Sequence, residues 1–138
     1  MIERPEQTSL TDCNFCRRVS VGHFIAESNL VVVFRDAYPV TPGHVHIAPR
    51  RHVENFFDLT FQEREAMFEM IGRAREWADE EHSPDGYNIG INVGEAAGQT
   101  VPHCNIHLIP RYAGDSPDPR GGVRWVQPDR APYLDGRV

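Results

Sequence analysis

Two histidines and an asparagine alternate near the end of the sequence, as His103, Asn105 and His107. In an extended segment, side chains two residues apart share a face and stand about 6 to 7 Å apart. The three polar groups would then point together, and the apolar residues between them would point the other way. Such a row could surround one phosphate-sized group. The simpler alternative is a half-exposed strand that happens to carry two histidines.

A pair of cysteines, Cys13 and Cys16, forms the second pattern with chemical potential. Their two-residue gap allows two thiolates to bind one tetrahedral zinc ion. A redox pair is the rival interpretation, but redox pairs of this spacing lie in a βαβ unit, which the sequence does not predict. We therefore favour a structural zinc site, for which two further ligands are needed. Cys104 lies on the apolar side of its segment and is expected in the core.

The elements that carry these groups follow from hydrophobic patterning. Residues 29–34 and 44–48 are β-branched or alternating and are separated by two prolines and a glycine, which predicts two strands that pair as neighbours. Residues 87–93 and 103–111 have a similar character. The sequence therefore predicts two strands in each half of the chain.

One main helix is predicted between these two pairs of strands, over about residues 60–82. Thr60 and Glu63 form the pattern of a capping box at its start. The apolar residues that follow have the 3, 4, 7 spacing of a helix with one buried face. The order of elements predicts an α+β fold with a mostly antiparallel sheet.

With 138 residues, the chain has the length of one ordinary domain, predicted over residues 1–138 with a core at 13–112. Prolines and glycines are frequent in residues 113–138, which predicts a loop with brief regular pieces. Val123, Trp125 and Val126 of this tail are expected to pack against the body of the domain.

Composition limits the classes of partner and compartment. The net charge is −6 and the basic residues are scattered, which argues against nonspecific binding to nucleic acid or an anionic membrane as the main activity. No apolar stretch has the roughly 18 residues of a membrane span, and the N-terminus lacks the apolar centre of a signal peptide. Three cysteines are too few for a secreted disulfide framework. We expect a cytoplasmic protein.

The segment 98–111 resembles the signature of the histidine-triad (HIT) family, in which three histidines alternate with apolar residues after Gly-Gln-Ser/Thr-Val. The middle histidine is the one difference, because that position is Asn105. The resemblance is to bacterial members with a Cys-x-x-Cys pair, and an ordered set of matches is more specific than a single motif. It extends over roughly residues 13–112, with further matches at 13–16, 34–36, 42–44, 49–53 and 88–94.

This resemblance implies a nucleotide hydrolase that cleaves the α-phosphate linkage of a dinucleoside polyphosphate, such as diadenosine tetraphosphate, or of a nucleoside phosphoramidate. In the family, the middle histidine attacks the α-phosphorus, and water opens the nucleotidyl-histidine intermediate. The amide of Asn105 is a feeble nucleophile, so we expect turnover to be severely impaired. Its hydrogen-bonding groups should let ligand binding survive. An engineered and a natural origin of Asn105 are both compatible with the sequence, and we favour the first.

The resemblance also implies roles for other residues. His107 would contact the scissile phosphoryl group, and Asp36 would hold the ribose hydroxyls, although it could equally be a turn residue. His52 and His103 would complete the zinc site. The remaining implied positions are Gln99 and Thr100 beside the phosphate and leaving group, Asn92 as a phosphate-side donor, Phe15 and Phe34 in the base pocket, and His44 as an orienting partner behind the triad. No role is predicted for His23, His46 and His82.

Three whole-protein hypotheses follow. The first is a HIT-family hydrolase or a nucleotidyl transferase or phosphorylase of the same superfamily, with a purine mononucleotide as product. The second is a nucleotide-binding regulator without turnover, which Asn105 would suit. The third is a zinc-containing interaction domain without a nucleotide site. The family resemblance further implies a homodimer.

Overall fold

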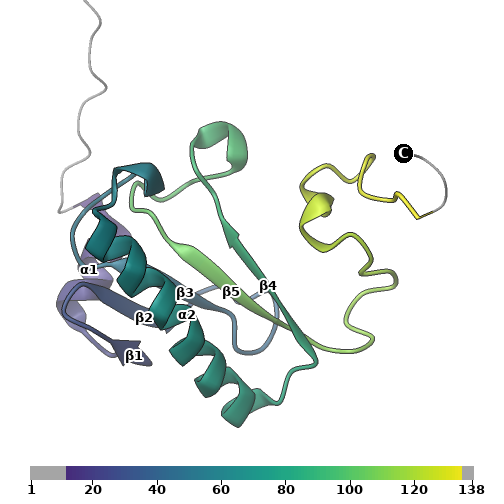
Figure 1. Cartoon of the computed structure of the whole chain (residues 1–138), viewed down its shortest axis with the longest axis horizontal. Helices are drawn as coiled ribbons and strands as arrows, with labels where there is room; N and C mark the ends of the chain where they lie inside the picture. The colour runs from purple at the N-terminus through teal and green to yellow at the C-terminus, as the bar shows by residue number, and fades with distance from the viewer. Residues whose placement is uncertain (1–11, 135–138) are drawn as a thin grey trace, which may run out of the picture.

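The computed structural model describes residues 12–134, so both ends of the predicted domain, 1–11 and 135–138, lie outside the described residues. Its centre is a five-stranded antiparallel sheet with the strand order β1-β2-β3-β5-β4 (Figure 1). The strands are β1 Ala26–Glu27, β2 Val31–Arg35, β3 Val45–Pro49, β4 Gly86–Ile91 and β5 Ile106–Arg111. The predicted α+β class and antiparallel sheet are confirmed.

The predicted pairing of the first two strands is also confirmed, since β2 and β3 are antiparallel neighbours. The last strand begins later than predicted, at Ile106 instead of His103. The backbone N–H of His103 donates to Val101 O at 2.8 Å, and the N–H of Cys104 donates to Val53 O at 2.6 Å. These bonds bend the chain ahead of β5, so His103 and Asn105 do not belong to the strand.

The main helix, α2, runs over Phe61–His82 and covers one face of the sheet (Figure 1). Its capping box is present as predicted. Thr60 Oγ1 accepts the N–H of Glu63, and Glu63 Oε1 accepts the N–H of Thr60, both at 3.0 Å. The buried Glu63 carboxylate also accepts two hydrogen bonds from Arg51. The core between α2 and the sheet includes Val31, Val33, Val45, Ile47, Met67, Met70, Ile106 and Leu108.

The sheet face opposite α2 carries a smaller apolar cluster around a second helix, α1, over Asn14–Val21. Helix α1 was not predicted from the sequence. Its N-cap is Cys13, whose sulfur accepts the N–H of Cys16 at 3.4 Å. Phe15 of α1 packs edge-on against Phe34 of β2, with ring centroids 5.1 Å apart. This face of the sheet holds the polar residues with chemical potential.

The tail beyond β5 extends past the β4 edge of the sheet and contains one short 3-10 helix, η4, over Gly122–Val126 (Figure 1). The expected packing of its apolar residues was wrong, because Val123 is 62% and Val126 80% exposed. Within the tail, Arg124 donates to Ala131 O and lies over the Tyr133 ring, and η4 lies against β4. Neither α2 nor any other helix of the described chain combines the length and apolar character of a membrane span.

Candidate functional site

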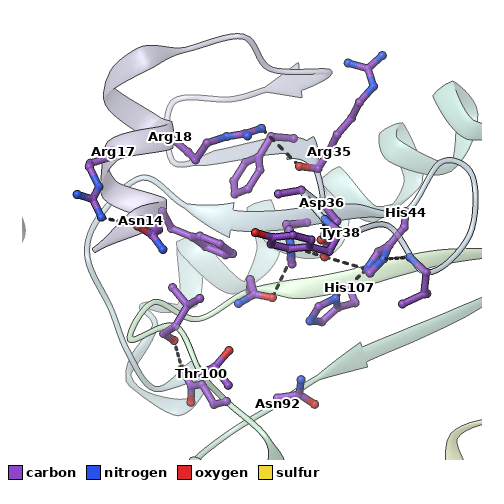
Figure 2. Close-up of a pocket in the computed structure, with 18 of the residues that line it drawn as sticks. Asn14, Arg17, Arg18, Arg35, Asp36, Tyr38, His44, Asn92, Thr100 and His107 are labelled. Carbon is purple, nitrogen blue, oxygen red and sulfur yellow. Dashed lines mark hydrogen bonds and ion pairs between the residues drawn. The ribbon is translucent and has the colours of Figure 1, made fainter. Parts of the chain in front are cut away.

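A pocket of about 880 Å³ opens on the sheet face opposite α2. Side chains of α1, including Asn14, Arg17 and Arg18, line one side, and Asn92 and Thr100 line another (Figure 2). The floor comes from the adjoining ends of β2, β3 and β5. Nine of the residues assigned to the site from the sequence border this pocket: Phe15, Phe34, Asp36, His44, Asn92, Gln99, Thr100, Asn105 and His107.

His103 does not share the pocket with Asn105 and His107. It is completely buried and lies beside the two cysteines of the N-terminal segment. The expected row of three side chains on one strand is therefore divided, because the bend ahead of β5 turns His103 away. Only Asn105 and His107 face the pocket.

A chain of hydrogen bonds determines which nitrogen of His107 carries a proton. The N–H of Val40 donates to His44 Nδ1 at 3.2 Å, so a neutral His44 carries its hydrogen on Nε2. His44 Nε2 lies 2.9 Å from His107 Nδ1 and donates to it (Figure 2). Burial lowers the pKa of both rings, which keeps them neutral. His107 must then carry its hydrogen on Nε2, and no group of the described chain accepts it.

Asp36 both forms a turn and contacts histidines. Its Oδ1 accepts the N–H of Tyr38 at 2.7 Å, and its Oδ2 lies 2.7 Å from Nε2 of His46 and 3.4 Å from Nε2 of His44. Burial raises the pKa of Asp36, but the Tyr38 N–H and the neighbouring histidines outweigh burial, so the pKa is lowered overall. The carboxylate is therefore ionised and accepts the Nε2 hydrogen of His46.

His46 is a buried pocket residue for which no role was predicted from the sequence. It is 8% exposed, lies opposite His107 in the pairing of β3 with β5, and places Nδ1 at 3.1 Å from Asn105 Oδ1. Asn105 Nδ2 donates to His103 O, also at 3.1 Å. Burial and then His107 lower the pKa of His46 to about 4, against the opposing effect of Asp36. The signal in the sequence was the two-residue spacing of His44 and His46, which puts both on one face.

Gln99 uses its whole amide group to hold the loop at the pocket edge. Its Oε1 accepts the N–H of Gly94 at 2.9 Å, and its Nε2 donates to Glu54 O and Val101 O at 2.8 and 3.1 Å. These hydrogen bonds hold the segment that carries Thr100 in place. The Thr100 side chain is exposed on the pocket side of this loop (Figure 2).

Four further side chains form a candidate zinc site: Cys13, Cys16, His52 and His103. His103 Nδ1 lies 3.5 Å from both sulfurs, and His52 Nδ1 lies 3.2 Å from Cys16 Sγ. His103 Nε2 donates to Pro49 O at 2.7 Å, which leaves the lone pair on Nδ1, directed at the thiols. Two sulfurs and two nitrogens are a common tetrahedral set for structural zinc. The residues fit this ion.

The thiols explain why a cation suits this group. None of the three cysteines is in a disulfide. Burial and then Cys13 raise the pKa of Cys16 to about 11, because a thiolate there would be poorly solvated and close to a second sulfur. A bound zinc ion would stabilise both thiolates.

A second set of potential ligand atoms, on Asp36, His44 and His107, lies within 4.8 Å of one another in the pocket. His44 Nδ1 accepts a backbone hydrogen bond, so its Nε2 carries a proton and offers no lone pair to a metal. Hydrogen bonds account for this cluster, and we do not assign a metal to it.

Comparison with known proteins shows the family to which this fold belongs. The family model described as HIT domain matches residues 17–114. The chain belongs to the HIT family. The crystal structure of a zinc-bound histidine triad family protein from Mycobacterium smegmatis superimposes with a TM-score of 0.70 at 31% identity, covering 92% of this chain and 98% of that one. The resemblance inferred from the sequence is confirmed.

Two HIT-family relatives with named activities also match. The asymmetrical bis(5'-nucleosyl)-tetraphosphatase of Schizosaccharomyces pombe is 38% identical over 88 residues, which are 64% of this chain and 48% of that enzyme. The AP-4-A phosphorylase of Mycobacterium tuberculosis is 32% identical over 96 residues, which are 69% of this chain and 49% of that enzyme. The chain thus spans about half the length of each enzyme.

Proposed function

We propose that this HIT-family protein binds a nucleoside phosphate in the pocket, with the phosphoryl group beside His107 and Asn105. The observation that carries the proposal is the hydrogen-bond chain from Val40 through His44, which leaves the Nε2–H of His107 free to donate into the pocket. A phosphate oxygen is a strong acceptor for such a donor. The two nearby arginines of α1, Arg17 and Arg18, add positive charge on the same side of the pocket.

The pocket also suits a nucleoside. Phe15 and Phe34 form an apolar edge-to-face pair, and the Arg18 guanidinium lies 4.8 Å from the Phe34 ring centroid. We assign these rings to the base, and the ionised Asp36 to a ribose hydroxyl. Gln99, Thr100 and Asn92 would border the phosphate and the leaving group.

For the reaction, we propose hydrolysis of a dinucleoside polyphosphate at its α-phosphate, with nucleotidyl transfer or phosphorolysis as the related alternative. The names of the two enzyme relatives support this substrate class. The covalent route through a nucleotidyl-histidine at position 105 is closed to this chain, so its turnover should be weak. A regulator that binds nucleotides without turnover is the second candidate, favoured by Asn105.

We further propose that Cys13, Cys16, His52 and His103 hold one structural zinc ion. Residues 1–138 would form one HIT-like domain that acts as a homodimer, which a mass measurement in solution would test. A monomeric mass would contradict the dimer.

Nucleotide binding should be visible as stabilisation. Adenosine monophosphate or diadenosine tetraphosphate at a hundred times its dissociation constant should raise the free energy of unfolding by about 2.7 kcal/mol. His107→Ala should weaken binding about tenfold or more, because it removes the donor to a charged group. Chemical denaturation with and without nucleotide measures the first effect, and titration calorimetry measures the second.

His82→Ala is the matched control, because His82 is exposed at the end of α2 and does not border the pocket. It should bind nucleotide as the unmodified chain does. If no purine nucleotide stabilises the protein, the zinc-containing interaction domain replaces this proposal.

A further inference from the structure

We propose that Arg18 of α1 contacts the base of the bound nucleotide and selects a purine with an oxygen at C6, such as guanine, over adenine. The inference rests on the proposed nucleotide function and adds the residue that determines base preference. It gives Arg18 a role besides the positive charge that its side chain adds to the pocket.

Arg18 lies at the end of the pocket that we assign to the base. Its guanidinium is 4.8 Å from the centroid of the Phe34 ring. From Phe34, ring contacts lead toward the phosphoryl end, with centroids 5.5 Å apart for Phe34 and His46 and 4.7 Å apart for His46 and His107. Figure 2 shows Arg18 on the α1 side of the pocket and His107 on the side of β5. Arg18 is therefore placed to contact the base.

The guanidinium of Arg18 has donors without acceptors. Its Nη2 donates to Arg35 O at 3.4 Å, and no carboxylate among residues 12–134 pairs with the half-buried side chain. The other two arginines that border the pocket differ from it. Arg17 is exposed and donates to Asn14 Oδ1, and the Arg35 guanidinium lies 5.2 Å from the ring centroid of Trp77 in α2. Arg18 thus has N–H groups available to a ligand at the base end.

The direction of the base follows from Asp36, to which we assign the ribose. Asp36 comes two residues after Phe34, and its N–H continues the ladder by donating to His44 O at 3.1 Å. The side chains of Phe34 and Asp36 therefore share one face. With the ribose at Asp36, the glycosidic nitrogen would face Asp36. The far edge of the purine, which carries the substituent at C6, would then face Phe34 and Arg18.

The donors of Arg18 match this edge in guanine and not in adenine. A guanidinium has five N–H groups and no acceptor, and its fork fits the O6 and N7 acceptors of guanine. Adenine has an amino group in place of O6, so donors would face each other. Phe15 and Phe34 are 8% and 2% exposed, which makes this end apolar. A donor left unpaired there costs free energy, so Arg18 should disfavour adenine.

Stacking of the guanidinium on the base is the alternative contact. It depends little on which base is present, because every base has a π face. The two contacts therefore differ in the ratio of the affinities for guanosine and adenosine monophosphate, and this ratio is the quantity to measure.

The test measures the dissociation constants of guanosine, inosine and adenosine monophosphate for the complete chain by titration calorimetry. The guanosine and inosine nucleotides share O6 and N7, and each should bind about tenfold tighter than the adenosine nucleotide, as one arginine–base pair supplies. Arg18→Met keeps an unbranched apolar side chain against Phe34 and removes every donor. It should lower the ratio to about one while adenosine monophosphate still binds, which shows that the variant folds.

Two controls separate base recognition from charge. Arg17→Met removes a positive charge from the same side of the pocket and should weaken all three ligands equally, so the ratio stays unchanged. Arg64→Met changes an exposed arginine of α2 that does not border the pocket. It should alter neither the affinities nor their ratio.

The outcomes separate this inference from the proposed function. Equal affinities of the unmodified chain for the guanosine and adenosine nucleotides overturn the role of Arg18, whatever the variants do. A preference that persists in Arg18→Met, or one for guanosine over inosine monophosphate, overturns it as well. Each of these results leaves the nucleotide pocket in place. Absence of binding by all three nucleotides refutes the proposed function and this inference together.

Discussion

Asn105→His should raise the turnover of diadenosine tetraphosphate by roughly 10² to 10⁴-fold, since loss of a nucleophile costs enzymes at least this much. A neutral imidazole has a nitrogen lone pair at neutral pH and is a good leaving group once substituted, whereas an amide nitrogen has neither property. The Asn105 amide already donates to His103 O, which gives a new ring an acceptor for one N–H. The other nitrogen would face the pocket.

The measurement is the rate of nucleoside monophosphate release, together with a search for a labelled adduct at residue 105. Asn29→His introduces the same side chain at an exposed position outside the pocket and should change neither result. If Asn105→His still binds nucleotides but cleaves none of the candidate substrates, the regulator without turnover becomes the better account.

Cys16→Ser should abolish stoichiometric zinc binding and lower the free energy of unfolding by about 3 kcal/mol or more, as is typical for loss of a structural metal. The four proposed ligands join α1 to the segments that carry His52 and His103, because Cys13 is the N-cap of α1 and Cys16 lies in its first turn. A chelator should act in the same direction on the unmodified chain. Elemental analysis of the purified protein and denaturant unfolding measure the two effects.

Cys104→Ala is the matched control for zinc content. Cys104 is a buried thiol of the main core, and burial raises its pKa to about 12, so it is a neutral apolar side chain. Its removal should leave one zinc ion per chain. Zinc content that is unchanged in Cys16→Ser, or absent from the unmodified chain grown with zinc, would exclude the structural zinc site.

Short sequence patterns predicted the parts of the fold that depend on residues close together in the sequence. The capping box at Thr60 and Glu63 and the pairing of residues 29–34 with 44–48 both depend on neighbours in sequence or on a short turn. Helix α1 was missed because it has eight residues and its N-cap is a cysteine, which is not among the usual N-cap residues. Its stability comes from packing and from its thiols, neither of which has a periodic signal.

The candidate site also combines features that the sequence predicted with features that it could not predict. Nine residues that the resemblance assigned to the site border one pocket. Alternation within residues 103–107 could not show that hydrogen bonds of Cys104 and His103 bend the chain there. Nor could it place His46. The spacing of His44 and His46 shows a shared face, but which strand lies beside β3, and in which register, is set by the whole sheet.

Helix α1 connects the proposed zinc site with the proposed nucleotide pocket. Cys13 and Cys16 belong to the proposed zinc ligands, while Phe15 between them contacts both His103 and the pocket residue His46. A cation that holds the first turn of this helix also holds one wall of the nucleotide pocket. By thermodynamic reciprocity, nucleotide should then strengthen zinc binding by as much free energy as zinc adds to nucleotide binding.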